Sequence, residues 1–306
     1  MFQRLVIALD GSAHAETAAR AGALLAARTG AAVTLLHILE RHAPATIHGE
    51  RHLRTEAEAR SYLSDVAQRC FAAGARVAIE VRLATDRQLA RRMAGAVREL
   101  QAGLLVMTTH GPRGWRRSLF GSLAQQVVGQ AHVPLLVVAA GAVRGAKPDE
   151  EFAFRRMLVA HGGDAAHEPA LAAGIELARR CGAQVRLVMI VPTRETLSGP
   201  GSAAAQLLPR ASRAALEMAR SDALAHLHAH VGEVRAQGVA IEMEVLRGDP
   251  VDGIIAASKA FDADLVVLGT HGKAGTHAFW EGSVAPRVCE QLGVSALLVP
   301  AADTPG

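Results

Sequence analysis

The stretch Gly269-Thr270-His271-Gly272, followed by nine residues and then by Gly282-Ser283, decides how this chain folds. The apolar run 265–268 precedes this stretch, and the apolar segment 284–288 follows it. A buried strand, a glycine-containing loop and a helix would produce this order of residues.

The same pattern occurs earlier in the chain. The apolar run 104–107 precedes Thr108-Thr109-His110-Gly111, and after nine further residues Gly121-Ser122 precedes the segment 123–130. Two copies with the same spacing and the same flanks predict an internal repeat, because a chance match would not reproduce the context. For a chain of 306 residues, this repeat predicts two domains of ordinary size.

Both halves alternate short apolar runs with amphipathic segments. In the first half we expect strands at 5–9, 33–39, 77–83, 104–107 and 134–138, and helices at 13–29, 56–73, 87–100 and 123–130. In the second half we expect strands at 157–160, 185–191, 239–246, 265–268 and 296–299, and helices at 168–180, 213–237 and 251–260. Continuous apolar strands that alternate with helices predict parallel βαβ units in a doubly wound sheet.

Composition excludes several classes of protein. Hydrophobic residues make up 50% of the chain, aromatic residues 3%, and the net charge of +4 comes from scattered arginines. Few aromatics and no basic tract argue against nucleic-acid binding. The three cysteines form no Cys-x-x-Cys pair, and no apolar run is long enough for a membrane helix, so we expect a soluble cytoplasmic protein without membrane insertion.

The repeated glycine motif has the chemistry of a phosphate site. Glycine allows the backbone to approach a ligand closely, and the helix that each Gly-Ser opens offers free N–H groups and a partial positive charge. The alternative is a structural turn with a serine that caps the helix. The motif is not a P-loop, because no lysine precedes the serine. Ligands of doubly wound sheets bind beyond the carboxyl ends of the strands, where Asp10 ends the first strand.

The combination of Asp10-Gly11-Ser12 after the first strand, the run Leu35-Leu36-His37-Ile38 and the two glycine motifs resembles the universal stress protein family in its tandem form. The resemblance covers residues 5–139 and 157–300. It implies two Rossmann-like α/β domains of the adenine nucleotide alpha hydrolase-like type, each a five-stranded parallel sheet of order 3-2-1-4-5. We expect domain one at 1–142, a linker at 143–153 and domain two at 154–302.

The resemblance also implies ATP, with or without Mg²⁺, as a ligand in each domain. The implied residues of domain one are Asp10, Ile38, Met107, His110, Gly111, Gly121 and Ser122. Those of domain two are Ile190, Gly269, His271, Gly272, Gly282 and Ser283. Each copy departs from the pattern once: Thr108 stands at the first glycine of the domain-one motif, and Gly162 stands at the aspartate position of domain two. The sequence leaves open which domain binds nucleotide.

Histidines suggest further sites. His48 and His52 would share a face if their segment were helical, so a Zn²⁺ site is one interpretation and an exposed polar loop is the other. On the helix at 213–237, His226 and His230 share a face and His228 does not, and we expect a polar helix surface there.

Three functions follow from these observations. The first is a stress-response module that binds ATP or a related adenine nucleotide and regulates an unidentified protein partner. The second is a slow ATP hydrolase, for which Asp10 is the one well-placed carboxylate. The third is a nucleotide-free scaffold with a metal in domain one. The resemblance implies that the two domains pair through their fifth strands, 134–138 and 296–299, and a homodimer is left open.

Overall fold

The structure is a computed structural model of the whole chain. It describes residues 1–41, 46–47, 50–84, 88–108, 122–139, 154–197, 207–270 and 284–301. The predicted linker at 143–153 lies outside these ranges.

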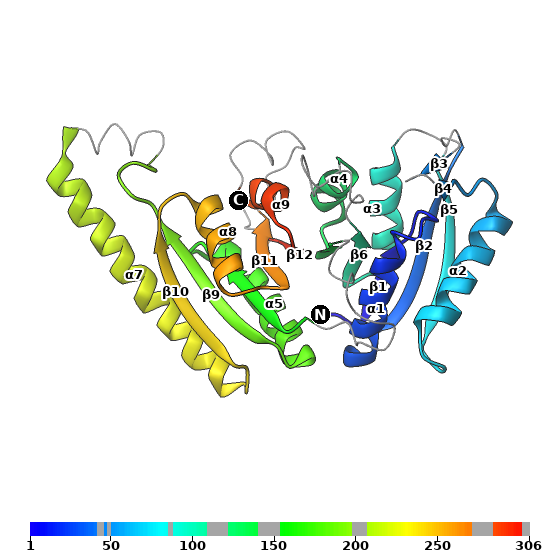
Figure 1. Cartoon of the computed structure of the whole chain (residues 1–306), viewed down its shortest axis with the longest axis horizontal. Coiled ribbons are helices and arrows are strands. Elements are labelled where there is room, and N and C mark those ends of the chain that lie inside the picture. The colour runs from blue at the N-terminus through cyan, green and yellow to red at the C-terminus, as the bar shows by residue number, and fades with distance from the viewer. Residues whose placement is uncertain are drawn as a thin grey trace.

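Domain one alternates strands and helices as expected (Figure 1). Its elements are β1 (Arg4–Ala8), α1 (Glu16–Thr29), β2 (Ala32–Glu40), β3 (Thr46–Ile47), β4 (Glu50–Arg51), α2 (Glu56–Cys70), β5 (Val77–Ala84), α3 (Leu89–Glu99), β6 (Leu104–Thr108), α4 (Ser122–Ala131) and β7 (Leu135–Val138). The short hairpin β3–β4 lies in the segment of His48 and His52 and has no apolar alternation that could have predicted it. Helix α2 ends three residues before the predicted end at 73, where Phe71 leaves the helix with an extended backbone.

Domain two repeats this order with a longer second helix. Its elements are β8 (Arg156–Ala160), the 3-10 turn η1 (Ala165–His167), α5 (Glu168–Cys181), β9 (Gln184–Val191), α7 (Pro209–Ala236), β10 (Ile241–Arg247), α8 (Pro250–Ala260), β11 (Leu265–Thr270), α9 (Val284–Gln291) and β12 (Ser295–Pro300). Helices α1 and α5 correspond: each begins at a glutamate and ends at a glycine with positive φ, Gly30 at 69° and Gly182 at 66°. Both helices therefore end at a glycine in the left-handed conformation.

All ten long strands form one sheet, in the order β10-β9-β8-β11-β12-β7-β6-β1-β2-β5. Within each domain the strands are parallel and follow the order 3-2-1-4-5, so the predicted fold is confirmed. At the centre, β12 pairs antiparallel with β7, with Leu297 opposite Leu136. This central strand pair, called the seam below, is the association through the fifth strands that the resemblance implied.

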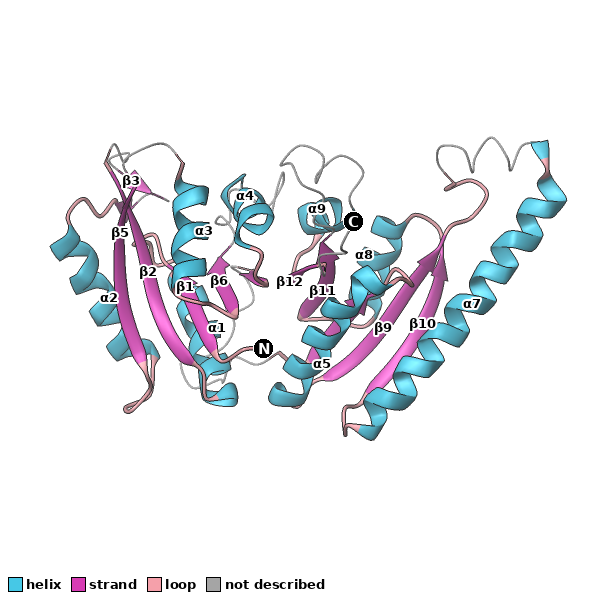
Figure 2. Ribbon diagram, turned by 180° about the vertical axis from the view of Figure 1, so that it is seen from behind, coloured by secondary structure: helices cyan, strands magenta, loops and turns pink. Residues whose placement is uncertain are grey.

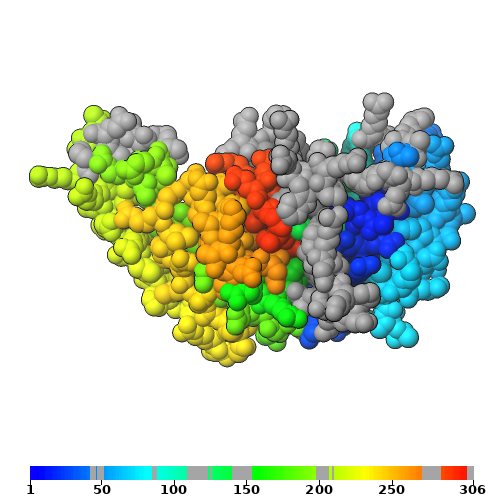
Figure 3. Space-filling view, viewed as in Figure 1, coloured from blue at the N-terminus to red at the C-terminus, as the bar shows by residue number. Residues whose placement is uncertain are grey.

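Helices cover both faces of the sheet (Figure 2). Helices α1, α2, α5 and α7 pack on one face, and α3, α4, α8 and α9 pack on the other. Each face has an aliphatic core that runs through both domains, because residues of both halves belong to the same cluster. Figure 3 shows the two halves side by side, with α8 and α9 (orange and red) at the surface of domain two.

Two further observations concern the class of protein. Within the part of the chain that the structure describes, no helix is both long and apolar enough to cross a membrane. The three cysteines, Cys70, Cys181 and Cys289, are free.

Candidate functional site

A cavity of about 240 Å³ lies at the carboxyl ends of the central strands of domain one. This domain-one cavity is lined by Asp10 after β1, Ile38 on β2 and Met107 on β6, which the resemblance had singled out from distant parts of the sequence. Leu123, the second residue of α4, also lines it, so the amino-terminal end of that helix borders the cavity. The cavity lies at the switch point, where doubly wound sheets bind ligands.

A tight turn holds Asp10 at the edge of this cavity. Asp10 Oδ1 accepts hydrogen bonds from the backbone N–H of Ser12 at 2.9 Å and from the Ser12 hydroxyl at 2.7 Å. Gly11 between them has φ of 94°, which glycine adopts without strain. The turn therefore fixes the carboxylate beside the cavity, and part of its hydrogen-bonding capacity is used within the turn.

Two buried histidines form another part of the cavity wall. His37 Nδ1 donates to the carbonyl oxygen of Leu9 at 2.7 Å, while its Nε2 is buried and has no hydrogen-bond partner in the described structure. Burial lowers the pKa of His37, partly offset by the bond to Leu9, and the charge of nearby His52 lowers it further. The imidazole is therefore neutral near pH 7, because its ordinary pKa is 6.5.

His52 is also buried and differs from the exposed loop residue that one interpretation expected. Its Nδ1 lies 2.9 Å from the carbonyl oxygen of Leu53, and its Nε2 lies 4.0 Å from Glu40 Oε1. His48 lies outside the described residues, so the zinc site at His48 and His52 stays a prediction.

The corresponding cavity of domain two has a volume of about 350 Å³ and a different wall. Ile190 and Gly269 line it as the resemblance implied, together with His161, Gly162 and His167. A Cβ on Gly162 would lie 2.4 Å from His167 Cε1, and one on Gly269 would lie 3.2 Å from His167 Cδ2. The imidazole of His167 therefore occupies the space beside both glycines, and an aspartate at position 162 would collide with it.

The glycine motifs themselves fall largely outside the described residues. His110, Gly111, Gly121, His271, Gly272, Gly282 and Ser283 are in this group. The helices that follow them are described: α4 begins at Ser122 and α9 begins at Val284, directly after the second Gly-Ser pair. The prediction that a helix opens at each Gly-Ser is therefore confirmed, whereas the phosphate-binding roles stay predictions.

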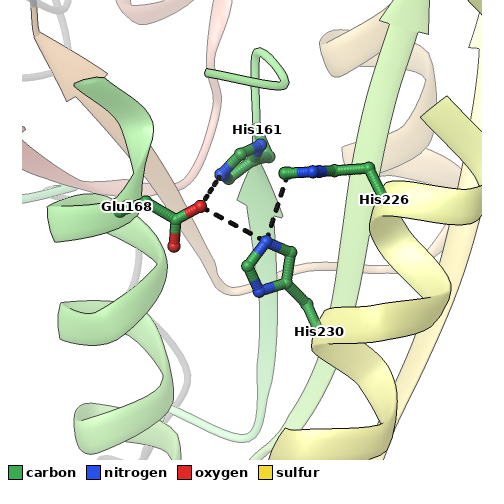
Figure 4. Close-up of side chains that lie close together, drawn as sticks. All are labelled: His161, Glu168, His226 and His230. Atoms are coloured by element: carbon green, nitrogen blue, oxygen red, sulfur yellow. Dashed lines mark hydrogen bonds and ion pairs between the residues drawn. The ribbon is translucent and has the colours of Figure 1, made fainter. Parts of the chain in front are cut away.

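The structure shows a cluster in domain two that the sequence did not predict (Figure 4). His161, Glu168, His226 and His230 each offer a ligand atom, and these atoms all lie within 4.8 Å of one another. The expectation of a polar surface for His226 and His230 is wrong, because both are half-buried and face Glu168 and His161; His228 is exposed as expected. The spacing of His226 and His230 was the available signal, but nothing local identified what their shared face contacts.

Comparison with known proteins points to one family. The universal stress protein family matches residues 1–139 and 153–300. Universal stress protein Sll1388 of Synechocystis sp. is 38% identical over 84 residues, 28% of this chain and 54% of that relative, so the match spans about half its length.

Two crystal structures match over nearly the whole chain. A universal stress protein from Archaeoglobus fulgidus has a TM-score of 0.65 at 15% identity, over 98% of this chain and 99% of its own. PA1789 from Pseudomonas aeruginosa, described as functionally unknown, has a TM-score of 0.68 at 14% identity, over 98% of this chain and 93% of its own. At such identities these structures show the fold alone.

Proposed function

Because the chain belongs to the universal stress protein family, we propose that it binds ATP or a related adenine nucleotide in the domain-one cavity and acts as a regulatory module. The observation that carries the proposal is that Asp10, Ile38 and Met107 line one cavity at the switch point. In this proposal the nucleoside lies among these side chains.

The size of the cavity suits this arrangement. Its volume of about 240 Å³ is below the roughly 300–1,000 Å³ of sites that enclose a whole drug-sized ligand. A nucleotide would therefore place its nucleoside inside and its phosphates outside, toward the start of α4 near Ser122. A helix start favours phosphate because its N–H groups are free and its dipole is positive there. Mg²⁺ would accompany a triphosphate.

Two differences between the cavities favour domain one over domain two. Domain one keeps the carboxylate of Asp10, which can hydrogen-bond to a ribose hydroxyl. In domain two, His167 occupies the space beside Gly162 and Gly269, although the cavity volume is larger. The wall matters more than the volume, because the His167 ring fills the space where a nucleotide would approach the backbone of the two glycines.

The proposal also includes a cellular location and a role for nucleotide binding. The three free cysteines agree with the reducing, cytoplasmic location that the sequence predicts. Regulation of a protein partner is the role we assign to nucleotide binding. Hydrolysis is not part of the proposal, because Asp10 is assigned to the ribose hydroxyl and hydrolysis would need a further group that orients the attacking water.

The experiment is equilibrium binding of a fluorescent ATP analogue to the full chain and to two matched variants. Ile38 and Ile190 occupy corresponding positions on β2 and β9 and line the two cavities. Ile38→Trp fills the domain-one cavity and should abolish saturable binding, whereas Ile190→Trp should leave it unchanged. Circular dichroism checks that both variants fold. Saturable binding that survives in Ile38→Trp, or its absence in the unaltered chain, would refute the proposal.

A further inference from the structure

The cluster in domain two brings together four side chains from separate elements. His161 follows β8, Glu168 is the first residue of α5, and His226 and His230 lie one turn apart on α7. Figure 4 shows all four pointing toward one another. The structure thus assembles a carboxylate and imidazoles around one point, at the side of the domain-two cavity that His161 also lines.

Two of the separations between the polar atoms match those around a bound ion. His226 Nε2 lies 3.1 Å from His230 Nε2, and Glu168 Oε1 lies 3.3 Å from His230 Nε2. Zinc ligands lie about 2.0–2.2 Å from the metal, so ligand atoms around a tetrahedral ion are about 3.3 Å apart. Two histidines at i and i+4 on a helix are a spacing that directs both imidazoles at one ion.

The glutamate at the equivalent position in domain one has a different partner. Glu16, the first residue of α1, forms two hydrogen bonds with the guanidinium of Arg69 on α2, at 2.8 and 2.9 Å. Among the described residues, the ion-pair partners of Glu168 are instead the imidazoles of His161 and His230. A metal cation would supply the charge that arginine supplies in domain one.

His161 has a separate role that follows from its tautomer. Its Nδ1 accepts a hydrogen bond from the backbone N–H of Gly163 at 2.9 Å, which leaves the proton of the neutral ring on Nε2. Its Nε2 is fully buried, lacks a hydrogen-bond partner in the described structure and lies 3.4 Å from Glu168 Oε1. A protonated Nε2 cannot ligate a metal, but it can donate to a ligating carboxylate.

We propose that Glu168, His226 and His230 bind a divalent transition-metal ion, with Zn²⁺ the best fit, and that His161 positions Glu168. A site with imidazole and carboxylate ligands suits zinc and other first-row transition metals, whereas Mg²⁺ and Ca²⁺ prefer oxygen ligands alone. Three protein ligands leave the fourth position for water, and the Glu168 side chain, 43% exposed, gives the ion access from solvent. This site does not depend on nucleotide binding in domain one.

The experiment uses the full chain, stripped of metal with a chelator and then titrated with Zn²⁺ by calorimetry. We expect one Zn²⁺ per chain and no saturable binding of Mg²⁺. Glu168→Gln, His226→Ala and His230→Ala should each weaken Zn²⁺ binding by more than about 100-fold, beyond the roughly 10–100-fold of a lost supporting contact. The matched control is His228→Ala, on the same helix but exposed, which should bind as the unaltered chain does.

Cobalt distinguishes ligands from the positioning residue. Bound Co²⁺ should give the intense visible absorption of a four-coordinate site, and the ligand variants should lose it. His161→Asn should keep that spectrum while Zn²⁺ binds roughly 10–100-fold more weakly. Circular dichroism confirms folding, and Glu168→Gln preserves side-chain size. Equal Zn²⁺ affinity in the unaltered chain and in a His226→Ala/His230→Ala double variant would overturn the proposal. Loss of Zn²⁺ binding in the single variant His52→Ala would also overturn it, because His52 lines the domain-one cavity.

Discussion

Replacing Leu297 with alanine should destabilise both domains, because its side chain packs at the seam that joins them. Leu297 on β12 lies opposite Leu136 on β7, and both are fully buried in the core cluster that runs through both halves. A buried leucine truncated to alanine costs about 2–5 kcal/mol, the transfer term plus the cavity left behind. We expect about 3 kcal/mol, which is roughly a 100-fold change in the unfolding equilibrium.

Native-state hydrogen exchange followed by mass spectrometry measures this effect for each domain separately. In Leu297→Ala, the slowest amides of β1 and β2 should exchange roughly 100-fold faster, as should those of β8 and β9. The matched control is Leu63→Ala: Leu63 is also fully buried, but α2 packs on domain-one strands. This control should accelerate exchange in domain one more than in domain two. Domain-one amides that keep their original rates in Leu297→Ala would show that the seam does not couple the domains.

Three other predictions follow from single positions. A Cβ on Gly22 would lie 2.2 Å from Ile7 Cδ1, so Gly22→Ala should lower the free energy of unfolding by about 1–3 kcal/mol in denaturant titrations. A Cβ on Gly95 would meet open space, so Gly95→Ala should raise the free energy of unfolding by about 0.5–1 kcal/mol. Because the pKa of His37 is lowered in the folded protein, the unfolded chain binds more protons below pH 6.5. The free energy of unfolding should therefore fall from pH 7.5 to pH 5, and it should fall less steeply in His37→Asn. The same dependence on pH in the unaltered chain and in His37→Asn would contradict this assignment. Burial raises the pKa of Cys181 to about 11, so iodoacetamide at pH 8 should alkylate this thiol far more slowly in the folded protein than in urea. Equal rates of alkylation in the two states would show that folding does not bury this thiol.

The order of strands and helices could be predicted because it depends on local periodicity. Continuous apolar runs such as 104–107 bury both faces of a strand, and the glycines at 30 and 182 end helices through their own backbone freedom. The hairpin β3–β4 could not be predicted, because two-residue strands have no period. The predicted end of α2 at 73 is wrong, because the helix ends at Cys70 and Gly74, with φ of 89°, lies in the turn beyond it.

The candidate sites depend on contacts between segments that are distant in the sequence. The repeat and its resemblance identified Asp10, Ile38 and Met107, and the sheet order brings them to one cavity, because the carboxyl ends of parallel neighbours share an edge. The sequence also showed that domain two lacks the aspartate. Only the structure shows the physical reason, which is that the ring of His167 occupies that space.

The sequence by itself determined the repeat, the fold class and the position of the turn after the first strand. The repeat follows from two motifs with the same spacing, and the other two follow from patterns between residues close together in the sequence. The tertiary structure decided that two glutamates at the starts of equivalent helices have different partners. Glu16 meets Arg69, whereas Glu168 meets His230 and the ring of His161. No local pattern encodes this difference, because it depends on which face the long helix α7 turns toward the end of β8. The histidines that the sequence assigned to a polar surface therefore became the strongest candidates for a metal site.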